Sequence, residues 1–128
     1  MCLWEDIHLD KIIKVGVYQE KFNTLLQISL PVSDICIYPG VEKHINKRHS
    51  DYLQYIDKIS DIISNPDYIG KHPSIENSIE LIKVFDENIL VSVNLDEKNG
   101  YLYVSSLYDV KQGKIERRLN SGRLIKFE

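Results

Sequence analysis

Three strand-length apolar runs in the second half of the chain constrain the fold more than any other feature of the sequence. They cover Ser78–Asp86, Ile89–Leu95 and Tyr101–Tyr108, and the segments between them are short and rich in turn residues. The second connection contains Asn99-Gly100, a strong hairpin signal because both residues tolerate positive φ. Connections this short force neighbouring strands to pair antiparallel, so the sequence predicts an antiparallel meander here.

The first half of the chain shows mainly helical spacing. The expected elements are a strand at Lys11–Val17, a helix from Gln19 to Pro31, a strand at Ile35–Tyr38, one or two helical turns at Val41–His49, and a longer helix between the N-cap Ser50 and Pro66. The tail from Lys111 is ambiguous: Lys114–Leu119 fits a helical turn, while Arg123–Phe127 alternates like an edge strand. Helices first and a meander afterwards predict an α+β domain.

A chain of 128 residues fits one domain, and its apolar fraction of 43% is that of an ordinary globular protein. No apolar run approaches the roughly 20 residues that cross a bilayer, and Glu5 and Asp6 stand where a signal peptide needs basic residues. We therefore expect a cytoplasmic protein without a membrane partner. Cys2 and Cys36 form no CxxC motif, and both are expected to be reduced thiols.

The charge of the chain is unevenly distributed. A net charge of −3 argues against a protein that coats nucleic acid through bulk charge. From Val110 to Phe127, however, six basic residues face the single acid Glu116. Such a segment can hold a phosphate chain at one place, or it can be an ordinary solvated tail.

Two histidines, His44 and His49, lie among the cations Lys43, Lys47 and Arg48. Five helical positions of ~100° each would put the two rings roughly 140° apart, so they could not share a metal as an HExxH pair does. Imidazoles can instead take and give protons near neutral pH, while the cations attract a phosphodiester. The alternative is an exposed polar helix with incidental histidines.

Two further groups of polar residues occur on predicted strands. Ser106 and Tyr108 are two residues apart, so their hydroxyls should share one face with Leu102 and Val104. They could bind a phosphate or a base, or be ordinary strand residues. Lys83 stands alone in an apolar strand, where a lysine either reaches the sheet edge or points into a site.

Together these residues resemble the phage-associated nucleases of the barnase–EndoU–colicin–RelE fold group. The most specific parts are the HxxxRH-like histidine segment and the turn around Asn65-Pro66-Asp67. The segments that carry the resemblance are Gly40–His49, Ile63–Ile69, Gly100–Tyr108 and Arg118–Leu124. The resemblance implies a single domain over residues 1–128, with a nuclease-like core at 41–127 and a loosely matching part at 1–40. It also implies N-terminal helices packed against a C-terminal antiparallel sheet of about four strands.

The resemblance further implies a metal-independent endoribonuclease, without a cofactor, from a phage or mobile element. Its catalytic residues would be His44, His49, Lys83, Ser106 and Tyr108, and it would use the RNA 2′-hydroxyl as nucleophile. The RNA-binding cations would be Lys43, Lys47, Arg48, Lys114, Arg117, Arg118 and Arg123. The expected partners are RNA (tRNA or ribosome-bound mRNA) and an immunity protein, antitoxin or phage structural protein. The alternative is a non-catalytic module on the same fold that binds RNA, a ribosome or a phage protein.

Overall fold

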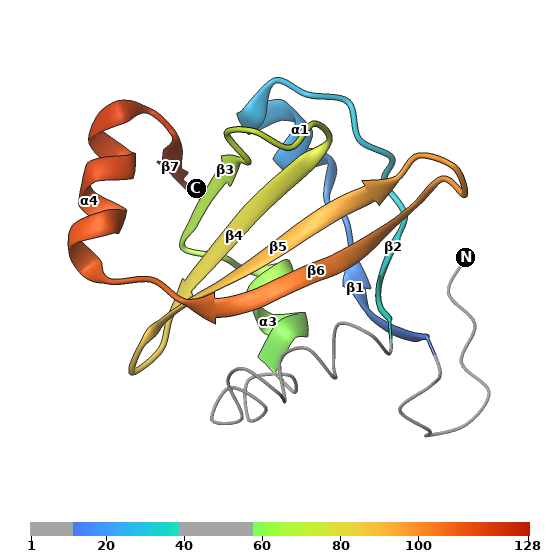
Figure 1. Cartoon of the computed structure of the whole chain (residues 1–128), viewed down its shortest axis with the longest axis horizontal. Helices are drawn as coiled ribbons and strands as arrows, with labels where there is room; N and C mark the ends of the chain where they lie inside the picture. The colour runs from blue at the N-terminus through green and yellow to red at the C-terminus, as the bar shows by residue number, and fades with distance from the viewer. Residues whose placement is uncertain (1–11, 39–57) are drawn as a thin grey trace.

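The computed structural model describes residues 12–38 and 58–128 as an α+β arrangement around one seven-stranded sheet (Figure 1). The sheet order is β1-β2-β6-β5-β4-β3-β7, and β2 pairs parallel with β6 whereas the other neighbours pair antiparallel. The elements are β1 (Ile13–Val17), α1 (Glu20–Leu26), β2 (Asp34–Ile37), α3 (Ile59–Ser64), β3 (Tyr68–Lys71), β4 (Ser78–Val84), β5 (Asn88–Asp96), β6 (Tyr101–Asp109), α4 (Gln112–Ser121) and β7 (Leu124–Lys126).

The predicted meander is confirmed, because β4, β5 and β6 are consecutive antiparallel neighbours. The predicted α+β class is confirmed too, but the sheet is larger than the predicted antiparallel sheet of about four strands, and the helices are not all N-terminal. The sheet is mixed, since β2 reaches β6 through a long connection that allows parallel pairing. The longest of the described helices, α4, follows the meander.

One face of the sheet packs on α1 and α3 and forms the larger core (Figure 1). Phe22 of α1 and Ile62 and Ile63 of α3 are buried there against Leu81 of β4 and Val91 of β5. We call this side the α3 face. Burial of these apolar side chains is the main force that holds the two helices on the sheet.

The opposite side of the sheet, which we call the α4 face, carries a smaller core. Ile115 of α4 is buried against Ile82, Leu90 and Leu124, with Val110 completing the cluster. Figure 1 shows α4 standing beside one end of the meander. The rest of this face carries polar side chains, of which Ser78, Glu80 and Ser92 are buried and those of β6 are partly exposed.

A β-bulge interrupts the pairing of β5 with β6. Ser92 pairs with Ser106, but the next residue, Val93, pairs with Val104, so Ser105 is an extra residue in β6. A bulge leaves two residues opposite one and changes the alternation of side chains along the strand.

The bulge overturns one prediction about β6. Leu102 and Val104 belong to the core of the α3 face, whereas Tyr108 packs against the cluster of the α4 face. Ser106 lies on the α4 face too, because it pairs with Ser92, which pairs with the α4-face residue Glu80. The prediction that Leu102 and Val104 share a face with Ser106 and Tyr108 is therefore wrong, because strict alternation fails at a bulge.

Three smaller features complete the description. Cys36 is buried and disulfide-bonded, so the expectation of a reduced thiol is wrong for this residue. In the β5–β6 turn only Gly100 adopts positive φ, and the Asp96 carboxylate accepts hydrogen bonds from the backbone N–H groups of Lys98 and Asn99. Neither α1, α3 nor α4 has the length and apolar character that a bilayer crossing requires.

Candidate functional site

A buried ion pair organises the α4 face. Glu80 lies in the middle of β4 with only 1% of its side chain exposed, and Arg123 directly precedes β7. Nη2 of Arg123 lies 3.0 Å from Oε1 and 3.1 Å from Oε2 of Glu80. A carboxylate this deeply buried would be costly without such a partner, so Glu80 fixes the position of the arginine.

The close approach of Arg123 to the sheet depends on Gly70. This glycine pairs with Glu80 on one side and with Leu124 on the other. A Cβ atom at position 70 would lie 2.2 Å from the carbonyl oxygen of Arg123. The carbonyl of Arg123 can therefore approach β3 this closely only because residue 70 has no side chain.

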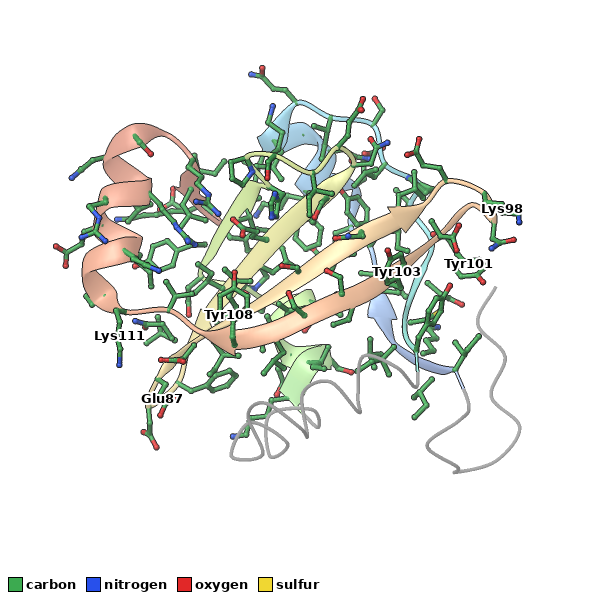
Figure 2. The ribbon with its side chains drawn as sticks, in the orientation of Figure 1. Glu87, Lys98, Tyr101, Tyr103, Tyr108 and Lys111 are labelled. Atoms are coloured by element: carbon green, nitrogen blue, oxygen red, sulfur yellow. The ribbon has the colours of Figure 1, made fainter. Side chains whose placement is uncertain are left out.

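Tyr108 of β6 interacts electrostatically with this charged cluster. Burial raises the pKa of Tyr108, and the carboxylate of Glu80 raises that pKa further, while Arg118 and Arg123 act in the opposite direction. Its hydroxyl is consequently neutral near pH 7 and available as a hydrogen-bond donor. Figure 2 shows Tyr108 at the end of β6 that lies beside α4.

Both arginines of the cluster keep spare hydrogen-bonding capacity. Nη1 of Arg118 and Nε of Arg123 are buried and have no hydrogen-bond partner among the residues that the structure describes. Buried guanidinium N–H groups are normally satisfied, and an anion with several acceptor oxygens would satisfy them. Two such arginines beside a neutral tyrosine hydroxyl form an arrangement suited to a phosphate or carboxylate group.

Short polar side chains line the sheet next to this cluster. The hydroxyls of Ser78 and Ser105 donate to Oδ1 of Asn94 at 2.6 and 3.1 Å. Glu80, Ser92 and Ser106 lie in one row across β4, β5 and β6. The α4 face thus carries polar side chains from the arginines toward the β5–β6 turn, with Ser78, Glu80 and Ser92 buried among them.

The structure brings together four of the residues singled out from the sequence: Ser106, Tyr108, Arg118 and Arg123 share the α4 face. Lys83 is on the other side of the sheet, where its Nζ donates to the carbonyl oxygen of Asn65 at 2.9 Å. It does not approach Tyr108, because β4 alternates and position 83 follows the face of Leu81.

The remaining site residues fall into two groups. Lys114 and Arg117 are exposed on α4, at the margin of the cluster. The other five, His44, His49, Lys43, Lys47 and Arg48, lie outside the described residues.

Sequence reasoning missed Glu80, although it carried a recognisable signal. The sequence of β4 is SIELIKV, in which Glu80 is as isolated among apolar residues as Lys83. An acid flanked by Ile79 and Leu81 on a predicted central strand should have suggested a buried carboxylate with a basic partner. The partner itself, 43 residues later, had no such signal.

Comparison with known proteins gives one match. Residues 13–117 match the model of the family described as phage-Barnase-EndoU-ColicinE5/D-RelE like nuclease3. No curated protein and no solved structure matches the chain. The matched range runs from β1 into α4 and includes Glu80, Ser106 and Tyr108, while Arg118 and Arg123 follow it.

Proposed function

Because this chain belongs to that family of phage-associated nucleases, we propose that it is an endoribonuclease that binds RNA on the α4 face of its sheet. The observation that carries the proposal is the pair of arginines there. Arg118 and Arg123 each have a buried guanidinium nitrogen without a partner in the described part of the chain, and both act on the neutral hydroxyl of Tyr108. A phosphodiester supplies the acceptor oxygens that this arrangement lacks.

The proposed reaction is transfer of a phosphoryl group within RNA, from the 5′-oxygen of one nucleotide to the 2′-oxygen of the nucleotide before it. The 2′-hydroxyl attacks the adjacent phosphorus, the bond from phosphorus to the 5′-oxygen breaks, and the products are a 2′,3′-cyclic phosphate and a 5′-hydroxyl. One of His44 and His49 takes the proton of the 2′-hydroxyl, and the other gives a proton to the departing 5′-oxygen. Arg123 and Arg118 stabilise the charge on the phosphorane.

The other polar residues bind and orient the substrate in this proposal. Tyr108 and Ser106 donate hydrogen bonds to the phosphate or the base, whereas Lys83 lies on the α3 face, away from these two hydroxyls. The cations that attract the RNA backbone are Lys43, Lys47, Arg48, Lys114 and Arg117. The proposed substrate is tRNA or ribosome-bound mRNA, and the proposed role is that of a toxin or effector. The proposed protein partner is an immunity protein, an antitoxin or a phage structural protein.

The chemistry can be tested with purified protein, mixed RNA, ribosomes and matched DNA. Attack by a 2′-hydroxyl needs no metal and cannot occur on DNA. Cleavage should therefore persist in EDTA, leave 2′,3′-cyclic ends and spare the DNA. Cleavage that EDTA abolishes, or equal cleavage of RNA and DNA, would contradict the proposed mechanism.

Catalysis is separated from binding by His49→Ala. Removing one acid–base group typically costs ~10²–10⁴-fold in rate, so cleavage should fall by about that factor while the thermal melt stays unchanged. Lys98→Gln, in the β5–β6 turn far from α4 (Figure 2), is the matched control and should cleave at the parental rate. If His49→Ala melts and cleaves normally, His49 is not one of the acid–base groups. A parent that binds RNA without cleaving it would instead make the non-catalytic binding module the better description.

A further inference from the structure

A second feature, a groove of about 710 Å³, opens at the end of the sheet where β3 ends and β4 begins. Three segments form its walls: the end of α1 with the residues after it, the β3–β4 loop, and the turn from α4 into β7. The volume is in the range of small-molecule sites. The side chains that matter below are Ile28, Lys71, His72, Ile75, Arg123 and Ile125.

Part of the groove is an apolar wall suited to a flat ring. Ile28 and Ile125 pack against the larger core and so form a fixed surface inside the groove. Ile75, in the β3–β4 loop, remains 48% exposed. An exposed isoleucine and a fixed apolar wall in one groove provide apolar surface against which a planar group can be desolvated.

His72 contributes a donor of fixed orientation to the same groove. Its Nδ1 lies 3.1 Å from the backbone nitrogen of Ser74 and 3.0 Å from that of Ile75, and both N–H groups donate to it. A ring nitrogen that accepts two hydrogen bonds carries no proton, so in the neutral ring the proton is on Nε2. The β3–β4 loop therefore presents His72 as a hydrogen-bond donor through Nε2–H.

Cationic side chains give the groove points of contact for an anionic group. Lys71 and Arg123 line it together with the acid Glu76. Glu80 offsets the charge of Arg123, but Nε of Arg123 has no hydrogen-bond partner among the described residues. Arg123 also belongs to the arginine cluster of the α4 face through its contact with Glu80. The groove and the proposed phosphodiester site are thus continuous at this one side chain.

We propose that the groove binds one nucleotide of the RNA substrate, with its base against Ile28, Ile75 and Ile125. The Nε2–H of His72 donates to an acceptor on the base edge, and the adjoining phosphate contacts Arg123. The proposal rests on the proposed function for the identity of the polymer. Binding of a single nucleotide, however, requires no cleavage, so the two can fail separately.

The test is titration of the full chain with each of the four nucleoside 3′-monophosphates and with inorganic phosphate. Chemical-shift changes of backbone amides locate the binding. We expect every nucleotide that binds to bind more tightly than phosphate and to shift the amides of the β3–β4 loop. Equal affinity for phosphate and nucleotides, or no nucleotide binding, would overturn the proposal.

Two variants and a control sharpen this result. Ile75→Trp fills the groove from an exposed position and should abolish nucleotide binding. His72→Ala should weaken it by about two- to twelve-fold, the loss expected for one hydrogen bond. Val32→Trp, at a position that is 55% exposed and outside the groove, should bind as the parent does.

The pattern of outcomes separates the inference from the proposed function. An Ile75→Trp protein that binds nucleotides like the parent overturns the groove assignment, even if the parent cleaves RNA. A parent that binds nucleotides in the groove but leaves RNA intact supports the groove and contradicts the endoribonuclease.

Discussion

At the scale of single residues, the candidate site depends on the carboxylate of Glu80, since it holds Arg123 in place from within the sheet. Glu80→Gln keeps the shape and removes the charge. We expect the free energy of unfolding, measured in urea, to fall by about 2–4 kcal/mol. This loss is below the usual one for a fully buried pair because the side chain of Arg123 is 28% exposed. The m-value should not change.

The matched control for Glu80→Gln is Asp34→Asn, which breaks the ion pair between Lys14 and Asp34 at the opposite side of the sheet. That pair is solvent-accessible and should contribute only about 0–1 kcal/mol. Equal losses for Glu80→Gln and Asp34→Asn would show that burial of Glu80 has no special energetic role.

Gly70 allows a second prediction about the same arginine. Gly70→Ala places a methyl group on the carbonyl of Arg123, so the turn into β7 must move. We expect a loss of about 1–3 kcal/mol, typical of overpacking, together with weaker RNA binding. Gly113 lies inside α4, and a Cβ atom added there would lie 3.7 Å from Nη1 of Arg117. Gly113→Ala should therefore raise the free energy of unfolding by about 0.5–1 kcal/mol. If Gly70→Ala is as stable as the parent, the carbonyl of Arg123 does not require a glycine at position 70.

Tyr108 determines part of the pH dependence. Burial raises the pKa values of Tyr108 and Tyr18, so both phenols hold their protons more tightly in the folded protein than at the unfolded value of about 10. Stability should thus be insensitive to these groups below about pH 10 and fall as the pH rises above it, because the unfolded chain ionises first. In urea titrations at several pH values above about 10, the free energy of unfolding of Tyr108→Phe should fall less steeply with pH than that of the parent. An equally steep fall would contradict the raised pKa of Tyr108.

At the scale of elements, α4 combines two roles. Ile115 fixes the helix on the sheet, and the exposed Lys114 and Arg117 are free to contact a ligand. The doubly substituted protein Lys114→Gln/Arg117→Gln should fold normally and bind single-stranded RNA with a salt slope lower by about 1.4, near 0.7 for each lost phosphate contact. The slope for Lys98→Gln should stay at the parental value. An unchanged slope in the double variant would remove α4 from the interface.

The elements also show what local pattern can and cannot predict. β4, β5 and β6 are long and strongly apolar, so their positions and antiparallel pairing followed from the sequence. β3 was not predicted because its four residues, YIGK, are few and contain a glycine, so they carry little strand signal. Their strand is formed by pairing with β4 on one side and β7 on the other. The bulge at Ser105 was equally hidden, since it lies between the two ordinary strand residues Val104 and Ser106.

The candidate site was predictable only in part, for a related reason. The Ser106 and Tyr108 hydroxyls share a face because of local strand geometry, even though the bulge changed which face it is. Glu80 and Arg123 meet only through the pairing of β3 with both β4 and β7, which nothing in the sequence near either residue specifies. Lys83 was grouped with Tyr108 on chain order alone, and chain order carries no information about faces.

At the scale of the whole molecule, stability should vary across the sheet. β5 lies near the centre, and its residues from Ile89 to Val93 are buried, whereas β7 has three residues at an edge. We expect backbone amides of β4, β5 and β6 to exchange hydrogen most slowly and those of β7 to exchange much faster. Equal protection of β5 and β7 would indicate that the sheet opens only as a single unit.

The two edge strands have a consequence for behaviour at high concentration. An exposed edge invites another molecule to add a strand, which leads to aggregation. β7 is only three residues long and ends in an exposed lysine, Lys126. β1 is irregular between Lys14 and Gly16, and the carbonyl of Val15 already accepts a hydrogen bond from Ser60. Both margins of the sheet are thus poor templates for a growing fibril.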